Sequence, residues 1–254
     1  MREEMTTNDA PWPILVLTLP GDKARRAPLI EALERAGLPF ELFHGVDGRQ
    51  GLDERWEQEI DRAAPRQTFG HDMTDGEFAC ALSHREIYRM VVEQGWPGAV
   101  VLEDDAILNK HFAAFVRGRH YDHAELVLLD HYHARVRDMG KEILPGVMLR
   151  RLVMSPFRTS GYSVSASAAQ ALLEAASPVR RFADWPLDIA ELGAMAVNPR
   201  IVAQPEAKPG NSHLREGRNQ RESEKRKHTR SWRRWRTRAY WRRWITKRRS
   251  TRIS

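Results

Sequence analysis

The sequence contains a single cysteine, Cys80, among its 254 residues. One thiol cannot form an internal disulfide or a cysteine-rich zinc site, so we expect a reducing compartment. The sequence also lacks the roughly 18 to 20 consecutive apolar residues that a membrane-spanning helix needs. Its first apolar run, 14–19, is too short for a signal peptide, and the residues before it are acidic. These absences predict a protein that is made and folded in the cytoplasm.

Acidic residues are scarce near the end of the sequence. Residues 215–254 contain 17 Lys and Arg against 3 Glu, whereas residues 1–214 contain 24 basic against 31 acidic residues. Arginine also alternates there with four of the eight tryptophans, Trp232, Trp235, Trp241 and Trp244. Cations and indole rings together suit the headgroup region of a membrane.

We therefore predict that 215–254 binds an anionic membrane surface, which would place the protein peripherally on the inner face of the cytoplasmic membrane. Two alternatives stay open: a solvated tail without a partner, and a nucleic-acid-binding protein in which Arg and Trp neutralise phosphates and stack on bases.

Apolar runs alternate with amphipathic stretches along the first 214 residues, which is typical of an α/β fold. Strands are predicted at 14–19, 39–44, 99–102, 126–129 and 194–203. Helices are predicted after the first strand with Pro28 near the first turn, over 76–94, and from Ser165 to about Ala176. Residues 49–75 are polar and irregular, consistent with a loop or small subdomain.

The composition, 41% hydrophobic, supplies enough apolar material for a core. We expect a flexible N-terminus over 1–12, one domain over 13–214 and a basic Arg/Trp-rich tail over 215–254. The domain is expected to hold a mixed, mostly parallel sheet with helices on both faces.

Three consecutive carboxylates, Glu103, Asp104 and Asp105, follow the apolar run 99–102. Strand ends in open α/β sheets border the ligand crevice, and carboxylate oxygens suit Mg²⁺ or Mn²⁺, which keep positions open for substrate phosphates. If the strand continues, Glu103 and Asp105 face the same side, where a cation would relieve their repulsion. The alternative is a set of solvated surface charges or the first turn of a helix.

Five segments, in this order, resemble motifs of glycosyltransferase family 25, the bacterial lipooligosaccharide galactosyltransferase group. They are 43–48 (Phe-His-Gly-Val-Asp-Gly), 76–84 (Gly-Glu-Phe-Ala-Cys-Ala-Leu-Ser-His), 101–105 (Val-Leu-Glu-Asp-Asp), 159–165 (Thr-Ser-Gly-Tyr-Ser-Val-Ser) and 184–187 (Asp-Trp-Pro-Leu). The sequence departs from the family pattern at Thr18, Gly21 and Ala79, where the family has asparagine, arginine and glycine.

The resemblance implies a GT-A-like nucleotide-diphospho-sugar transferase. The expected donor is UDP-galactose or a similar UDP-sugar, and the expected acceptor is a lipooligosaccharide or another lipid-linked glycan. A bound Mn²⁺ or Mg²⁺ would assist departure of the diphosphate. Glu103 and Asp105 are the candidate metal ligands, and Asp104 the candidate to orient the ribose or a basic side chain.

Inversion at the sugar carbon requires a carboxylate that takes the proton from the acceptor hydroxyl. Asp184 is the first candidate for this base and Asp188 the second, although Asp184 suits a helix cap as well. Thr18, at the end of the first strand, is a candidate for binding the donor. Arg25 and Arg26, just after that strand, either face the donor phosphates or form the solvated start of a helix.

Three further residues have alternative roles. His84 is either a structural or a catalytic histidine, Cys80 is expected in the core, and His213 is a weaker candidate metal ligand. The ordered family segments argue against a metal-dependent nuclease or phosphatase, and no stable nucleic-acid partner is expected.

Overall fold

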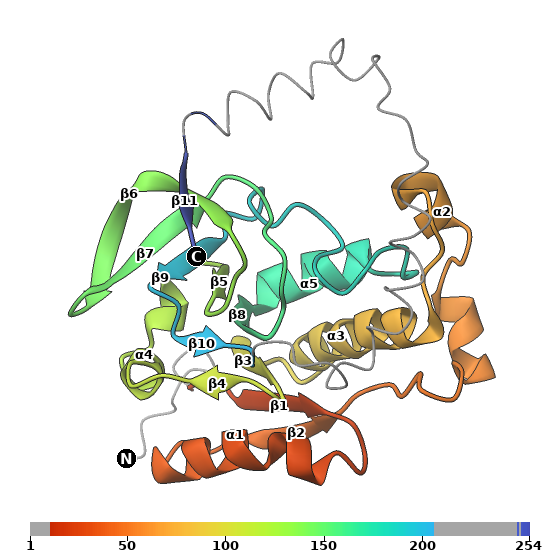
Figure 1. Cartoon of the computed structure of the whole chain (residues 1–254), viewed down its shortest axis with the longest axis horizontal. Helices are drawn as coiled ribbons and strands as arrows, with labels where there is room; N and C mark the ends of the chain where they lie inside the picture. Colours follow the sequence, from red (N-terminus) through yellow and green to blue (C-terminus); the bar gives the residue numbers. More distant parts are fainter. Residues whose placement is uncertain (1–10, 206–247, 249) are drawn as a thin grey trace, which may run out of the picture.

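The computed structural model describes residues 11–205, 248 and 250–254. Its strands are β1 Ile14–Thr18, β2 Glu41–His44, β3 Gly98–Glu103, β4 Ile107–Leu108, β5 Leu126–Leu128, β6 Ala134–Leu144, β7 Val147–Leu152, β8 Gly161–Ser165, β9 Met195–Asn198, β10 Val202–Ala203 and β11 Thr251–Ile253. Within this part of the chain, nine strands form one sheet in the order β11-β6-β7-β9-β5-β8-β3-β1-β2 (Figure 1). β4 and β10 form a separate pair.

Strands β2, β1, β3, β5 and β9 run in the same direction. β1 pairs in parallel with β2 and β3, and β5 pairs in parallel with β9. β8 lies between β3 and β5 and is antiparallel to both, so these two neighbours also point the same way. The carboxyl ends of all five strands therefore lie along one edge of the sheet, which is where open α/β sheets bind their ligands.

The predicted mixed sheet with helices on both faces is confirmed. The expectation that it would be mostly parallel is wrong, because three of its described strand pairs are parallel and five are antiparallel. The difference comes mainly from the β6–β7 hairpin and β11, which the sequence pattern did not predict, and from the reversed direction of β8.

The sheet is buried on both faces. In β3, Ala99 and Val101 belong to one apolar cluster, whereas Val100 and Leu102 belong to the other, as the two-residue repeat of a strand requires. Helices α3 (Asp75–Glu93) and α5 (Ala166–Ala175), which lie side by side in Figure 1, cover the first face. Helices α1 (Lys23–Arg35) and α4 (Phe112–Arg117) cover the second.

Two helix starts differ from the sequence-based expectation. α1 begins at Lys23, so Pro28 lies inside the helix rather than near its first turn. α3 begins one residue earlier than expected, behind a capping box in which the Thr74 side chain accepts from the Glu77 N–H and the Glu77 side chain accepts from the Thr74 N–H. This reciprocal pair satisfies two amide groups at the start of the helix that leads to Ser83 and His84.

The remaining elements lie mostly where no regular structure was predicted. The segment 49–75 holds a 3₁₀ helix, Glu54–Glu59, and helix α2, Ala64–Phe69. A second 3₁₀ helix covers His120–His123. The expected last strand, 194–203, is two strands, β9 and β10, and β9 ends at Asn198, just before Pro199.

The end of the predicted tail belongs to the sheet. β11 pairs antiparallel with β6 at the sheet edge, and Ile253 is buried in the same apolar cluster as α3 and α5. The four tail tryptophans and His213 lie outside the described residues. Among the helices that the structure describes, none combines the length and apolar character needed to cross a membrane.

Candidate functional site

The three carboxylates 103–105 lie at the carboxyl end of β3, next to the end of β1. Glu103 is the last residue of β3, and its N–H donates to the carbonyl of Ser160. Asp104 and Asp105 are in a turn beyond the strand, so the two-residue alternation does not extend to them. The strand therefore does not continue through the triplet, and the condition under which Glu103 and Asp105 would face the same side is not met.

Asp104 and Asp105 share one guanidinium. Arg25 Nε lies 2.8 Å from Asp104 Oδ1, and its Nη2 lies 2.7 Å from Asp105 Oδ2. The Thr18 hydroxyl donates to Asp104 Oδ2 at 2.9 Å, and Arg26 Nη1 donates to the Thr18 oxygen at 3.4 Å. The four residues predicted to bind the donor, with one of the two predicted metal ligands, thus lie in one cluster.

One carboxylate of this cluster is only partly paired. Asp105 Oδ1 is buried and has no hydrogen-bond partner. Burial and the charge of Glu103, opposed by Arg25, together raise the pKa of Asp105 to about 6. Burial also raises the pKa of Asp104, against the effects of Arg25 and Thr18. A proton or a cation beside Asp105 would therefore be stabilised.

Glu103 has a different environment. Its Oε1 accepts from the Thr159 hydroxyl at 2.8 Å, and its Oε2 accepts from the Gln204 amide at 3.0 Å. His84 Nε2 lies 3.5 Å from Oε1. Burial acts to raise the pKa of Glu103, but His84, Thr159 and Arg25 outweigh it and the pKa is lowered. This carboxylate is therefore held in the charged form by groups on three other elements.

The turn after β2 packs against α3. The Val46 N–H donates to Ser83 Oγ at 2.8 Å, and Ser83 Oγ donates to the Ala79 carbonyl at 2.7 Å. A Cβ atom at Gly45 would lie 2.7 Å from Ser83 Oγ, and one at Gly48 would lie 2.6 Å from the Asp75 carbonyl oxygen. Glycine at both positions lets the turn approach the helix, which brings two of the family-like segments into contact.

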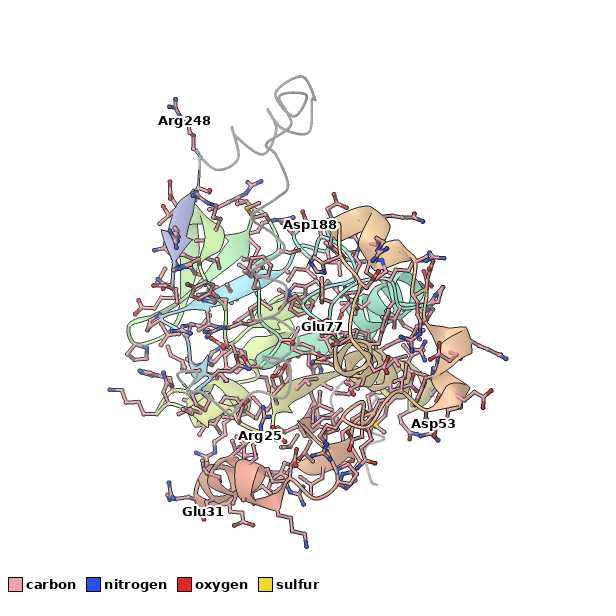
Figure 2. All side chains as sticks on the ribbon, turned by 45° about the vertical axis from the view of Figure 1, so that its right-hand side comes forward. Arg25, Glu31, Asp53, Glu77, Asp188 and Arg248 are labelled. Carbon is pink, nitrogen blue, oxygen red and sulfur yellow. The ribbon has the colours of Figure 1, made fainter. Side chains whose placement is uncertain are left out.

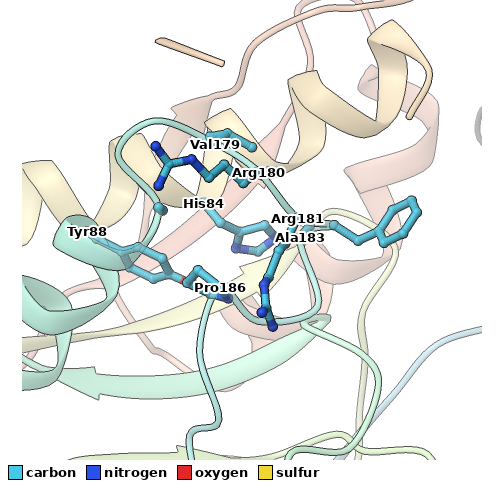
Figure 3. Close-up of a pocket in the computed structure, with 10 residues that line it drawn as sticks. His84, Tyr88, Val179, Arg180, Arg181, Ala183 and Pro186 are labelled. Carbon is cyan, nitrogen blue, oxygen red and sulfur yellow. The ribbon is translucent and has the colours of Figure 1, made fainter. Parts of the chain in front are cut away.

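His84 links this region to the segment around Asp184. His84 is buried, and its Nδ1 lies 3.0 Å from the Tyr162 hydroxyl. Tyr162 packs edge-on against Trp185, with ring centroids 5.4 Å apart. A small pocket beside His84 is lined by α3 and by residues on both sides of Asp184, including Ala183 and Pro186 (Figure 3).

The two candidate bases are placed differently. Asp184 Oδ1 accepts from the N–H of Arg158, the residue before Thr159, so it lies beside the loop that holds Glu103. Asp188 Oδ1 accepts from the N–H and hydroxyl of Ser155 and from the N–H of Ala190. Asp188 thus organises a loop, and it lies in a different part of the molecule from Arg25 (Figure 2).

Sequence reasoning missed a second charged cluster on the same sheet edge. Asp130, just beyond β5, is fully buried and is contacted by Arg158, Ser160 and Arg200. The signal that identified the carboxylates after β3, an acid following a short apolar run, is also present at 126–130. Gln204, which also contacts Glu103, has no comparable sequence signal, because the strand before it is only two residues long.

The comparison with known families settles the class of the protein. A family model described as "Glycosyltransferase family 25 (LPS biosynthesis protein)" matches residues 12–190. The chain belongs to this family. The predicted membership is confirmed, and the chain is a family 25 glycosyltransferase. The matched range runs from β1 through Asp184 and Asp188, and it ends before Arg200, Gln204 and the tail.

Family 25 relatives are distant. The chain is 24% identical over 207 residues to "Lacto-N-neotetraose biosynthesis glycosyltransferase LgtE" of Neisseria meningitidis serogroup B, covering 74% of this chain and 72% of that protein. It is 28% identical over 101 residues to LgtB of the same organism, covering 40% and 35%. A "Glycosyltransferase 25 family member" of Aedes aegypti is 27% identical over 168 residues, covering 63% and 28%. The chain therefore spans about a third of LgtB and of the mosquito protein in these alignments.

Proposed function

We propose that this family 25 enzyme transfers a hexose, most simply galactose, from a UDP-sugar to a lipooligosaccharide or another lipid-linked glycan. Transfer inverts the sugar carbon, and the enzyme acts at the inner face of the cytoplasmic membrane with 215–254 as its attachment. The family description and the names of the Neisseria relatives support this substrate class.

The observation that carries the proposal is the cluster of Thr18, Arg25, Asp104 and Asp105 at the ends of β1 and β3. A nucleoside diphosphate needs positive charge for its phosphates and acceptors for its ribose hydroxyls. Arg25 uses Nε and Nη2 for Asp104 and Asp105, so its remaining N–H groups would donate to a phosphate, and a cation at Asp105 would supply further positive charge. Asp104, fixed by Thr18 and Arg25, can accept from a ribose hydroxyl.

The cluster fits a divalent cation at Asp105. Its Oδ1 is a buried acceptor without a partner, and burial and the charge of Glu103 raise the pKa of Asp105, which favours a bound proton or cation. Glu103 fits less well, since both of its oxygens already accept hydrogen bonds. The described residues contain no group of three or more His, Cys, Asp or Glu side chains arranged around a metal, so substrate phosphates and water would complete the shell. When bound, the cation would neutralise charge that develops on the departing diphosphate.

Asp184 is the better candidate for the base. One of its oxygens accepts from Arg158, and the residue is next to the pocket that His84 lines. A carboxylate here would take the proton from the acceptor hydroxyl as that oxygen attacks the sugar carbon. Asp188 instead accepts three hydrogen bonds on one oxygen and stabilises its own loop.

The proposal is tested with UDP-galactose, UDP-glucose and UDP-N-acetylglucosamine, each with Mn²⁺ or Mg²⁺, by thermal stabilisation and by UDP release. We expect at least one donor to stabilise the protein and to be turned over. Arg25→Gln should weaken UDP binding by about tenfold or more, because charge-assisted hydrogen bonds are lost. Arg66→Gln, on exposed helix α2, is the matched control and should bind UDP normally.

Asp184→Asn should lower turnover by about 10²- to 10⁴-fold and leave UDP stabilisation unchanged. A larger loss in Asp188→Asn than in Asp184→Asn would contradict the assignment of the base. If no UDP-sugar at millimolar concentration changes the melting temperature, the proposed donor is wrong.

A further inference from the structure

The sheet edge that carries Glu103–Asp105 continues past β8 to a second polar cluster. The Ser160 carbonyl accepts from the Glu103 N–H, and the Gly161 carbonyl accepts from the Asp130 N–H. Asp130 and Glu103 thus flank the start of β8 on opposite sides. Since β3 and β5 are separated by one strand, the two clusters are about 10 Å apart.

Asp130 holds two arginine side chains at the surface. Arg200 Nη1 lies 2.8 Å from Asp130 Oδ1, Arg158 Nη1 lies 3.3 Å from Oδ2, and the Ser160 hydroxyl donates to Oδ2 at 2.5 Å. Asp130 is fully buried, whereas each arginine side chain is 30% exposed. Two guanidinium groups share one carboxylate, so the cluster has an excess of one positive charge with N–H donors left for solvent or a ligand.

Exposed aromatic rings border these arginines. Tyr132 is 48% exposed and Phe157 is 67% exposed, and a backbone bridge joins the two residues. The Arg158 guanidinium lies over the Tyr132 ring, 5.3 Å from its centroid. Arg158 also has a positive φ of 88°, a conformation that L-residues rarely adopt. Large rings exposed beside charged donors are typical of binding surfaces and contribute nothing to the core.

We propose that Arg158 and Arg200, with Tyr132 and Phe157, bind a phosphate or carboxylate group on the acceptor glycan. This inference rests on the proposed function, because it assigns the Glu103–Asp105 side of the edge to the donor and the Asp130 side to the acceptor. The paired arginines match an anionic group, and the rings supply flat surfaces for the attached sugar. Asp184, the candidate base, accepts from the Arg158 N–H and therefore lies where the two substrates would meet.

The test uses the full chain saturated with UDP and Mg²⁺, so that the donor phosphate region is filled. Glucose 6-phosphate, glucuronic acid and glucose are titrated separately, and binding is followed by saturation-transfer NMR. We expect the two anionic sugars to bind at least tenfold more tightly than glucose. Arg200→Gln should weaken binding of both anionic sugars by about tenfold or more and leave UDP stabilisation unchanged.

Phe157→Ala gives a second test that does not threaten the fold, because the ring is exposed. It should weaken binding of glucose 6-phosphate by about two- to tenfold, whereas Phe69→Ala, an exposed ring on α2, should have no effect. Asp130→Asn combined with Arg200→Gln avoids an unpaired buried charge and should bind as weakly as Arg200→Gln.

The possible failures are distinguishable. Absence of UDP stabilisation contradicts the proposed function. Normal UDP stabilisation with no preference for anionic sugars overturns the acceptor proposal alone. Anionic sugar binding that is as tight in Arg200→Gln and in the double variant as in the wild type also overturns it, because the anion would then bind elsewhere, such as the basic residues of 215–254.

Discussion

Replacing Asp105 by asparagine should stabilise the metal-free protein at neutral pH, although it removes a residue assigned to the donor site. The pKa of Asp105 is raised to about 6 from an ordinary value of 3.8. The folded state therefore holds the proton more tightly than the unfolded chain. Stability from this group is complete below the unfolded pKa and is lost as the pH rises through the folded pKa.

The size of the effect follows from the two pKa values. Between pH 4.5 and 7.5 the wild-type free energy of unfolding should fall by about 2 kcal/mol relative to that of Asp105→Asn. The full cost of ionising Asp105 in the folded protein, from a pH below both pKa values to neutral pH, is about 3 kcal/mol. The Asp105 side chain is only 20% exposed, so screening by solvent reduces this modestly. Asparagine keeps an oxygen for Arg25, and the main difference is the charge.

The assay is urea unfolding of both proteins with EDTA at pH 4.5, 5.5, 6.5 and 7.5. Asp72→Asn, whose carboxylate is 54% exposed in an ion pair with Arg66, is the matched control. The difference between wild type and Asp105→Asn should grow with pH and reach its limit above pH 6.5. If the difference in free energy of unfolding between the two proteins stays constant across the pH series, Asp105 is not a buried carboxylate with a raised pKa. The same variant should lose the extra stabilisation that Mn²⁺ gives in the presence of UDP.

Two more predictions concern the scaffold. Ile253→Ala should lower the free energy of unfolding by about 2 kcal/mol, because the Ile253 side chain is buried in the core. Arg252→Gln is the control, since Arg252 is exposed on the same strand. Equal stability of the two variants in urea would show that β11 does not contribute to the stability of the fold. Gly45→Ala should cost about 1 to 3 kcal/mol and weaken UDP binding, because the added methyl group would meet Ser83 and Leu17. Unchanged melting temperature and UDP affinity in Gly45→Ala would contradict the tight contact between the turn and α3.

The cluster at the ends of β1 and β3 was predictable because its signals are local. The runs 14–19 and 99–102 are short, apolar and bounded by turn residues, and both are buried strands. The triplet that follows the second run is recognisable without knowledge of its partners. The order of the family-like segments along the sequence identified the family, which the family model confirms.

The cluster around Asp130 depends on contacts between distant residues. Arg200 is 70 positions from Asp130, and Arg158 is 28 positions from it, so no window of sequence displays the pair. The β6–β7 hairpin was missed for a different reason. In β6 buried and less buried positions alternate only over Ala134–Val136, and residues 137–142 are all exposed. This leaves too short a pattern to identify a strand.

Consecutive residues Thr159 and Ser160 bind Glu103 on one side and Asp130 on the other, and this has a mechanical consequence. A single peptide unit cannot shift toward one carboxylate without changing its distance to the other. A ligand bound at the Glu103 cluster should therefore alter the affinity of the Asp130 cluster for its own ligand, and the reverse should also hold. The two binding free energies should then not add. The segment just before β8 would then couple the binding of the two substrates that the proposed reaction joins.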